Sequence, residues 1–242
     1  MNPYKQEYNF ESGEVILLDK PLKWTSFDLV KRVRSRIIRH LGIKKIKVGH
    51  AGTLDPLATG LMIICTGKAT KQIDSFLSDT KEYIAKIYLG ATTPTYDLES
   101  TVDQEYPTAH ITREFVEKAL EKLTGEIEQV PPIFSAIKID GQRAYDLARD
   151  GKDVEINARK VTIYETEIVN FEMPYLEVRI SCSKGTYIRS FARDIGVLLD
   201  SGAYLAGLIR TKIGPYLLTD AHDSHEFLNF LENLKQNSKS DV

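Results

Sequence analysis

One stretch of the sequence, residues 48–60, presents an acidic side chain in a setting suited to catalysis. Asp55 lies in a glycine-rich loop before Pro56, which fixes its own φ and disfavours helical geometry at Asp55. Four glycines between positions 49 and 67 let another backbone or a ligand come close. A carboxylate on such a loop can act as a nucleophile when a neighbouring cation keeps it ionised. The alternative is an Asp-Pro pair that only opens a turn.

Arg189 is a candidate for that cation. It falls in the first turn of a helix expected after Thr186, where a positive charge opposes the positive end of the helix. An arginine in this position usually has an anionic partner, either a phosphate or a carboxylate such as Asp55. A surface arginine paired with Asp194 or Asp200 fits the pattern equally well.

Two further side chains could contact a nucleobase. Tyr83 lies on an alternating strand and could stack on a base, although a buried core tyrosine fits the same pattern. His50, between Gly49 and Ala51, is equally ambiguous. A His-x-x-His pair occurs near the C-terminus, but no cysteine pair accompanies it, so we expect no metal site.

The charge of the chain is unevenly distributed. The net charge is −2 at pH 7, yet residues 20–50 contain ten Lys or Arg and one acid, Asp28. The rest of the chain is therefore strongly acidic. A compact basic stretch on an acidic protein is typical of phosphate binding, although many charge runs are solvated helix faces. Because acids are not interleaved with these bases, we favour a polyanion as the partner.

Length and composition indicate a globular protein. The chain has 242 residues, of which 42% are hydrophobic and 27% charged. No apolar run is long enough for a bilayer, no signal peptide is evident, and the two distant cysteines are typical of reduced thiols. We therefore expect a cytoplasmic protein without a membrane partner. Its single domain would cover residues 1–235, with an insertion at about 130–158 and a disordered tail at 236–242.

Hydrophobic periodicity predicts an α+β fold with a mixed sheet, because strands outnumber simple strand–helix–strand crossovers. The strands that position the candidate residues are expected at 14–18, 61–65, 81–89, 161–169, 175–183 and within 205–218. The helices are expected from Thr25 or Ser26 to about 41, from Thr112 to Gly125, from Thr186 to about 199, and over 223–234. In the insertion, a short strand over 134–139 and a basic helix over 143–149 are expected.

The first of these helices has two faces. Five apolar residues recur at helical spacing and should face the core: Phe27, Val30, Val33, Ile37 and Leu41. The remaining face is basic, with Lys31, Arg32, Arg34, Arg36 and Arg39. Their long side chains can bury the stem while the charged group reaches water or phosphate.

Six short segments, in the same order along the chain, resemble those of the bacterial tRNA pseudouridine-55 synthases, the TruB family. They are Leu18-Asp-Lys-Pro21, Gly49-His-Ala-Gly-Thr-Leu-Asp-Pro-Leu-Ala-Thr-Gly60, Lys81-Glu-Tyr83, Pro132-Ile-Phe-Ser-Ala-Ile-Lys138, Cys182-Ser-Lys-Gly-Thr-Tyr-Ile-Arg189 and Leu208-Ile-Arg210. One such segment would be weak, but six in order across residues 14–215 are specific.

The resemblance implies a pseudouridine synthase fold, with a mostly antiparallel sheet flanked by helices and an insertion that grips RNA. It implies conversion of uridine 55 in the T-loop of tRNA to pseudouridine, without a cofactor or metal. By resemblance Asp55 is the essential nucleophile, and the uracil is released, turned and rejoined through C5. Tyr83 would stack on the flipped base, His50 would fill the space that the base leaves, and Arg189 would pair with Asp55.

The resemblance also assigns weaker roles. Tyr187 and Leu208 would line the pocket, and Lys20 would support the loop or meet phosphate. The T-arm of tRNA would be positioned by backbone contacts from Arg32, Arg36, Arg39, Lys44 and Lys45. No obligatory protein partner is expected.

Two departures from the family pattern bear on substrate binding. Many members continue into a C-terminal PUA domain, and we expect this chain to be a short form without one. Asp97 stands in a sequence that differs from the usual Thr-Asp-Thr and is kept as a candidate RNA contact. The alternatives are a pseudouridine synthase that acts on another RNA and a non-catalytic RNA chaperone. Guide-directed action is disfavoured by the expected lack of a PUA domain.

Overall fold

The computed structural model describes residues 8–135, 138–139, 142–143 and 156–237. The chain forms two compact units, each held by its own internal contacts. Unit 1 combines residues 1–79 with 209–242, and unit 2 comprises residues 80–208. The expectation that residues 1–235 act as one catalytic domain stays a prediction, and each unit is described separately below.

Unit 1 is built on the strand β3 (Ala58–Thr66), which pairs antiparallel with β1 (Val15–Lys20). Residues 61–65 of β3 are fully buried, as expected of an apolar strand covered on both faces. Around this pair lie β2 (Val48–His50) on β3, β14 (His222–Asp223) parallel to β1, the end of β12 (Ala203–Ile213), and β13 (Tyr216–Leu217) on β12.

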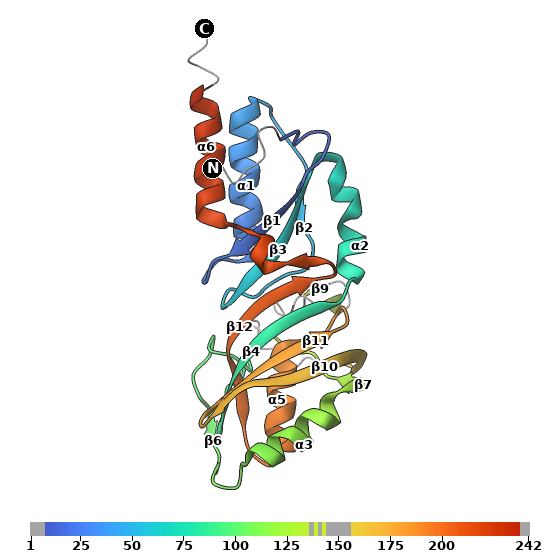
Figure 1. The fold of residues 1–242 in the computed structure, drawn as a ribbon, viewed down its shortest axis with the longest axis vertical. Helices are drawn as coiled ribbons and strands as arrows, with labels where there is room; N and C mark the ends of the chain where they lie inside the picture. Colours follow the sequence, from blue (N-terminus) through green and yellow to red (C-terminus); the bar gives the residue numbers. More distant parts are fainter. Residues whose placement is uncertain (1–7, 136–137, 140–141, 144–155, 238–242) are drawn as a thin grey trace. The chain divides into compact units, whose positions relative to one another are not determined.

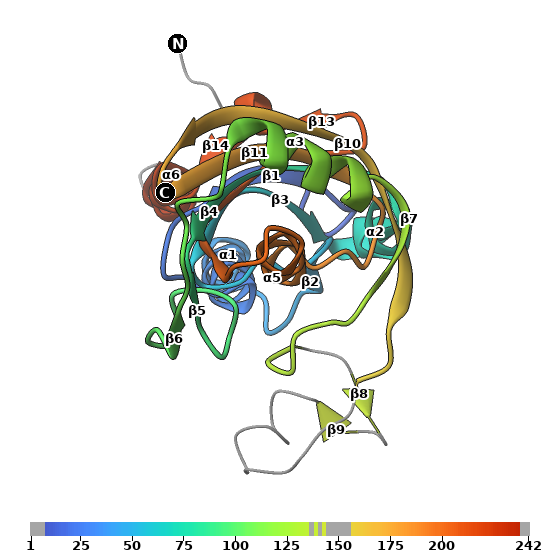
Figure 2. The same cartoon turned by 90° about the horizontal axis from the view of Figure 1, so that it is seen from below.

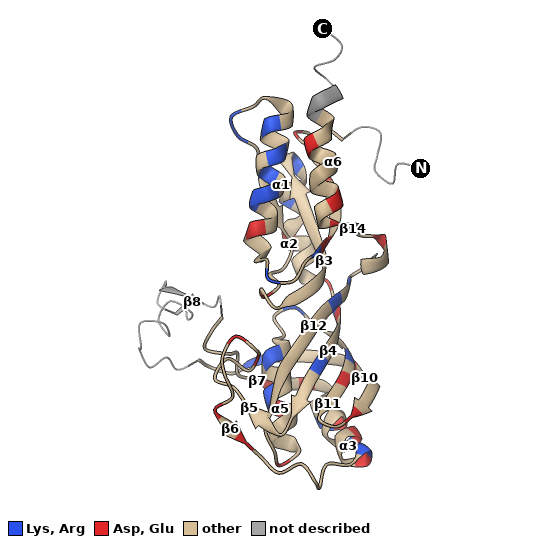
Figure 3. Ribbon diagram, turned by 90° about the vertical axis from the view of Figure 1, so that its left-hand side faces the viewer, with Lys and Arg blue, Asp and Glu red and all other residues tan. Residues whose placement is uncertain are grey.

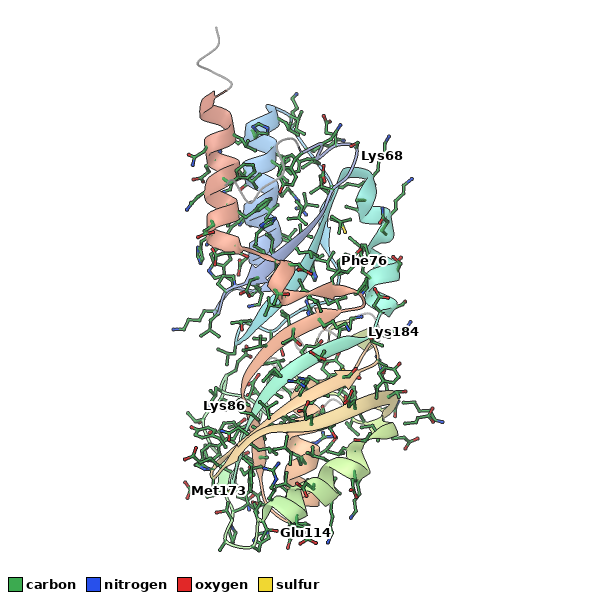
Figure 4. The ribbon with its side chains drawn as sticks, viewed as in Figure 1. Lys68, Phe76, Lys86, Glu114, Met173 and Lys184 are labelled. Carbon is green, nitrogen blue, oxygen red and sulfur yellow. The ribbon has the colours of Figure 1, made fainter. Side chains whose placement is uncertain are left out.

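Helices cover this sheet (Figure 1). The helix α1 (Ser26–Leu41) lies beside α6 (Ser224–Asn237), and the 3-10 turn η1 (Gly67–Gln72) leads into α2 (Ile73–Ser78). Thr25 caps α1 in a capping box with Asp28, which explains why the helix begins there. Phe76 of α2, labelled in Figure 4, belongs to a core cluster with residues of β3.

Unit 2 contains an antiparallel ladder of strands. The order is β4 (Lys81–Leu89), β11 (Tyr175–Cys182), β10 (Arg159–Glu172) and β7 (Gly125–Gln129), and β12 begins in this unit beside β4. Alternate residues of β4 and β11 are buried, which gives the ladder one core face.

Two helices pack on that ladder (Figure 2). The helix α5 (Ile188–Leu198) contacts β4, and α3 (Arg113–Leu123) contacts α5 and β10. Two small pairs complete the unit: β5 (Ala91–Thr92) with β6 (Gln104–Glu105), and β8 (Lys138–Ile139) with β9 (Gln142–Arg143).

The α+β class and the mostly antiparallel sheet are confirmed, but one face of the first helix was assigned wrongly. Phe27 was expected in the core, yet it is 62% exposed, whereas Ser26 and Leu29 are buried. Val30, Val33 and Ile37 are buried as expected, but at the start of the helix Ser26 takes the inward position and bonds the loop that contains Leu54. Leu41 is only half-buried.

The structure also bears on the expected start of α5, the insertion and the lack of a membrane-spanning helix. Tyr187, rather than Thr186, occupies the N-cap position of α5, because the Thr186 hydroxyl donates to the Ser183 carbonyl instead. Within the strand expected at 134–139, the described residues include β8, and residues 136–137 lie outside the described part of the chain. Most of the basic helix expected over 143–149, much of the insertion and most of the C-terminal tail also lie outside the described residues. No helix among the described residues is long and apolar enough to cross a membrane.

Candidate active site

The loop that carries Asp55 joins β2 to β3 in unit 1 and is held by hydrogen bonds on both sides of the carboxylate. The Ser26 hydroxyl donates to the Leu54 carbonyl at 3.0 Å and accepts from the Leu54 N–H at 2.8 Å. The Pro56 carbonyl accepts from the Lys23 N–H at 2.8 Å. The residues before and after Asp55 are thus tied to the start of α1 and to the turn that precedes it.

Arg210 binds both ends of the same loop. It is 1% exposed, and its Nε donates to the Leu61 carbonyl at 2.8 Å while Nη2 donates to the Gly52 carbonyl at 3.1 Å. A Cβ on Gly60, whose φ is +106°, would lie 2.4 Å from the Arg210 carbonyl oxygen, so only glycine fits there. The sequence placed Arg210 in a family motif without a role. The signal available was a charged residue within a largely apolar strand.

Lys20 is fully buried and supports the turn before α1. Its Nζ donates to the Pro21 carbonyl at 3.0 Å and to the Trp24 carbonyl at 2.6 Å. Burial lowers the pKa of Lys20 to about 8, and the charge of Asp55 acts in the opposite direction. Of the two roles expected for Lys20, its burial and bonds favour support of the loop, and a contact to phosphate stays a prediction.

His50 ends β2, just before the Asp55 loop, and is half-buried. Burial lowers the pKa of His50, so the ring is neutral at pH 7. Its Nδ1 is buried and has no hydrogen-bond partner among the described residues. An uncharged ring in this position suits contact with a base better than contact with a phosphate.

Arg189 lies in the first turn of α5 in unit 2 and is 6% exposed, so the surface alternative is wrong. Its Nη1 donates to the Thr95 carbonyl at 3.3 Å, and its Nη2 donates to the Phe134 carbonyl at 2.9 Å. Nε lies 3.6 Å from Asp97 Oδ2. The pairing of Arg189 with Asp55 stays a prediction, because Asp55 belongs to unit 1.

Asp97 is a buried structural group, which corrects its expectation as an RNA contact. It is 4% exposed, and its Oδ1 accepts from the Thr95 hydroxyl at 2.5 Å and from the Glu99 N–H at 3.0 Å. Together with the Arg189 ion pair, these contacts direct the carboxylate into the protein rather than toward solvent. The sequence could not show this because Asp97 and Arg189 lie far apart along the chain.

The segment of residues 129–135, which starts at the last residue of β7 and leads toward β8, is attached to the start of α5. We call it the 129–135 strap. Three hydrogen bonds fasten it: Tyr187 N–H to Gln129 Oε1 at 2.8 Å, Ser190 Oγ–H to the Val130 carbonyl at 2.8 Å, and Arg189 Nη2–H to the Phe134 carbonyl at 2.9 Å. The strap therefore holds the backbone or side chain of three residues at the start of α5, Tyr187, Arg189 and Ser190.

Tyr83 and Leu208 also lie in unit 2. Tyr83 is 9% exposed on β4, opposite Ile180 of β11. Leu208 is half-buried on β12. Of the seven residues expected to form the site, three are thus in unit 1 and four in unit 2.

The basic residues expected to meet RNA gather on α1 and the turn after it (Figure 3). Arg32, Arg39, Lys44 and Lys45 are exposed, and Arg32 also stacks on Trp24 at 4.2 Å. Arg36 instead forms an ion pair with Glu232 of α6 at 2.8 Å, and Arg39 lies 3.9 Å from the same carboxylate. Part of the basic face is therefore neutralised by an acid that is distant in sequence.

The chemistry available to this set is acid, base and nucleophile chemistry by side chains. In the described part of the chain, no group of three or more His, Cys, Asp or Glu residues could hold a metal ion. The two cysteines are buried, and burial raises the pKa of each thiol to about 11, so neither is a nucleophile at pH 7. That Asp55 acts as the nucleophile stays a prediction.

Comparison with known proteins identifies relatives over most of the chain. The family model described as "TruB family pseudouridylate synthase (N terminal domain)" matches residues 39–188. The tRNA pseudouridine synthase B of Phocaeicola vulgatus is 60% identical over 224 residues, which cover 93% of this chain and 95% of that protein. The protein of the same name from Flavobacterium johnsoniae is 52% identical over 87% of this chain and 93% of its own length.

Solved structures show the same fold at lower identity. A chain of a Cbf5–Nop10–Gar1 complex matches with a TM-score of 0.70 and 27% identity, over 95% of this chain and 57% of that one. A chain of an H/ACA RNP bound to a substrate RNA containing 2′-deoxyuridine matches with a TM-score of 0.68 and 25% identity, over 95% and 56%. This chain therefore spans a little over half the length of those chains. Together with the family match, the likeness confirms the expected pseudouridine synthase fold.

Proposed function

The chain belongs to the TruB family of pseudouridylate synthases and is therefore an isomerase, and we propose that its substrate is uridine 55 in the T-loop of tRNA. The observation that carries this proposal is the 60% identity, over nearly the full length of both chains, to a protein named tRNA pseudouridine synthase B. The relatives in RNA–protein assemblies are much less similar, at 25–27% identity. We propose that the reaction takes place in the bacterial cytoplasm, where tRNA is found.

We propose that Asp55 is the catalytic nucleophile. The bond between uracil N1 and ribose C1′ breaks, the uracil turns, and a bond forms between C5 and C1′. The hydrogen on C5 leaves as a proton and N1 gains one, so the reaction is redox-neutral and consumes no co-reactant. Support for Asp55 comes from its loop, because an oriented nucleophile needs a stiff backbone. Ser26 holds Leu54 before the carboxylate, and Arg210 holds both Gly52 before it and Leu61 after it.

The target uridine must leave its stack before Asp55 can reach it, which costs a few kcal/mol. We propose that Tyr83 stacks on the flipped base, with Tyr187 and Leu208 against its edges. A stacked aromatic ring contributes about 1–3 kcal/mol per base, enough to offset much of that cost. His50, neutral at pH 7, would fill the space that the base leaves.

We propose that the exposed basic residues of α1 and of the turn after it position the T-arm through its phosphates. Such contacts set the register of the RNA and carry little sequence information. Arg36 contributes less than Arg32 and Arg39, because Glu232 already neutralises it at 2.8 Å. For Lys20 we propose the other expected role, support of the loop, because its Nζ already donates to the Pro21 and Trp24 carbonyls.

The test is tritium release from unmodified tRNA labelled at uracil C5. Whichever carbon Asp55 attacks, the C5 hydrogen must leave, so release reports isomerisation directly. The wild-type protein should release one tritium per tRNA, and Asp55→Asn, which keeps the shape of the side chain, should release none. A tRNA with cytidine in place of uridine 55 should release none with either protein.

Two results would contradict the proposal. Release from the cytidine-55 tRNA would place the target elsewhere, and mapping of pseudouridine in RNA from cells that lack the protein would then find it in another RNA. Tight tRNA binding by the wild type without any release would favour the RNA chaperone. Equal release by the wild type and Asp55→Asn would move the nucleophile to another residue.

A further inference from the structure

The 129–135 strap contains a buried amide whose orientation is determined by its neighbours. Gln129 is 1% exposed, and its Oε1 accepts from the Tyr187 N–H at 2.8 Å. Flipping the amide would turn its NH₂ group toward that N–H, donor against donor, so the orientation follows from the bond. Its Nε2 therefore points away from Tyr187 as a donor. Nε2 is buried and has no hydrogen-bond partner among the described residues.

A second polar atom in the strap has the same property. Ser135 is 5% exposed, and its Oγ is buried without a hydrogen-bond partner in the described part of the chain. Ser135 directly follows Phe134, whose carbonyl accepts from Arg189 at 2.9 Å. The two atoms thus come from the two ends of the strap, one next to Tyr187 and the other next to Arg189.

Buried polar atoms without partners are rare, because each costs free energy, so each calls for an explanation such as a catalytic role or a bound water, ion or ligand. Here two of them fall within seven residues of the chain. Gln129 bonds Tyr187, and Phe134, which precedes Ser135, bonds Arg189. The family resemblance implies that Tyr187 and Arg189 lie at the substrate site. Both atoms belong to a segment that is bonded to Tyr187 and Arg189, so we attribute the missing partners to a ligand bound beside these two residues.

We infer that Gln129 Nε2 donates a hydrogen bond to an oxygen of the target nucleotide and that Ser135 Oγ makes a second hydrogen bond to the same nucleotide. This inference rests on the proposed function, since it names further contacts for the uridine that the enzyme isomerises. Uracil carbonyls and the ribose–phosphate oxygens are both acceptors and both suit an amide donor.

The first test is Ser135→Ala, which removes one hydroxyl and no contact within the described protein. Removing a buried polar atom without a partner should leave Tm unchanged or raise it. If the hydroxyl bonds the substrate, kcat/KM for tritium release should nevertheless fall at least tenfold. A higher or equal Tm together with lower activity is a combination that a purely structural serine would not produce.

The second test is Gln129→Glu, with Gln104→Glu on the exposed strand β6 as the matched control. The glutamate keeps an oxygen for the Tyr187 N–H and replaces the donor with an acceptor. We expect kcat/KM to fall at least tenfold for Gln129→Glu and to stay within twofold for Gln104→Glu. Circular dichroism and Tm, measured on all variants, identify any that fail to fold.

Binding of T-arm RNA with uridine or cytidine at the target position distinguishes the two acceptors. If Gln129 contacts the uracil O4, Gln129→Glu should weaken the binding of uridine RNA more than the binding of cytidine RNA, because cytosine has an amine in place of O4. A ribose or phosphate contact predicts an equal loss for both. Either result supports the inference.

The inference is overturned if folded Ser135→Ala and Gln129→Glu both keep wild-type kcat/KM and RNA affinity. A fall of Tm and activity together in Ser135→Ala would show that the hydroxyl serves the fold and would overturn its assignment. These outcomes test the inference only if the wild-type protein releases tritium from tRNA. A wild type without release refutes the proposed function itself, and the inference with it.

Discussion

The guanidinium of Arg210 donates to the carbonyl of Gly52 at 3.1 Å, three residues before the proposed nucleophile Asp55. The same guanidinium donates to Leu61 at 2.8 Å, six residues after Asp55. One buried side chain thus spans the base of the loop. Arginine suits this task, because its planar group can donate in two directions at once, whereas an ammonium is a compact point charge.

We expect Arg210→Met to lower kcat at least tenfold with little change in KM, because the loop would lose its anchor but not its contacts to RNA. It leaves two buried carbonyls unpaired, which should cost about 1–3 kcal/mol of stability each. Urea unfolding and tritium release measure the two effects. Arg179→Met, on the exposed side of β11, is the control and should change neither. Normal kcat in a folded Arg210→Met would refute the role of Arg210 as an anchor.

Ser26→Ala should also loosen the Asp55 loop. The hydroxyl bonds both the carbonyl and the N–H of Leu54, and Ser26 is 2% exposed, so alanine leaves a buried donor and acceptor without a partner. We expect a loss of about 1–3 kcal/mol in the free energy of unfolding, with a lower kcat. Ser35→Ala, on the exposed face of the same helix, provides the comparison. Equal stability of the two variants would contradict this prediction.

The lowered pKa of Lys20 predicts that the stability of the protein depends on pH. Burial lowers its pKa in the folded protein to about 8, below the ordinary 10.5. Between these values the unfolded chain keeps a proton that the folded chain has lost, so this residue's contribution to stability rises with pH. The rise is at most about 1.4 kcal/mol per pH unit.

Urea unfolding at pH 7, 8, 9 and 10 checks this expectation. Wild type should gain stability relative to Lys20→Met as the pH rises from 8 to 10, and the difference should be constant below pH 8. Lys31→Met, at an exposed position of α1, should track the wild type across the range. A Lys20→Met difference that is flat from pH 7 to 10 would mean that the folded pKa is not depressed.

Salt dependence of tRNA binding tests the basic face of α1. Each lost phosphate contact should reduce the slope of log K against log salt by about 0.7–0.9. We expect that reduction for Arg39→Gln, and the opposite change for Glu232→Gln, which frees Arg36 from an ion pair of 2.8 Å. Lys118→Gln, on α3, should leave the slope unchanged. If Arg39→Gln and Lys118→Gln behave alike, α1 is not the RNA-binding face.

Local patterns predicted several elements that position the site. The alternation of Tyr83, Ala85, Ile87 and Leu89 predicted β4 with its buried face, and the structure has the strand over Lys81–Leu89. Thr25 predicted the start of α1, where it caps the helix. These predictions succeed because side-chain alternation and helix capping depend on residues only a few positions apart.

Phe27 shows where local pattern fails. Its spacing fits the apolar stripe of α1, yet Ser26 takes the buried position because its hydroxyl serves the distant Leu54. Arg189 shows the same limit, since its partner Asp97 is 92 residues away along the chain. A helix turns about 100° per residue, so one long-range hydrogen bond is enough to change which side chain is buried.

The sequence by itself determined the family, the α+β class and the loop that presents Asp55, because ordered motifs and short-range periodicity are properties of the chain. Only the tertiary structure decided what holds that loop and how the strap meets α5. Lys20 became a buried support, Arg210 an anchor and Gln129 a donor without a partner. The burial and the hydrogen-bond partners of a residue depend on which distant segments of the chain pack together, and a local sequence pattern does not specify those contacts.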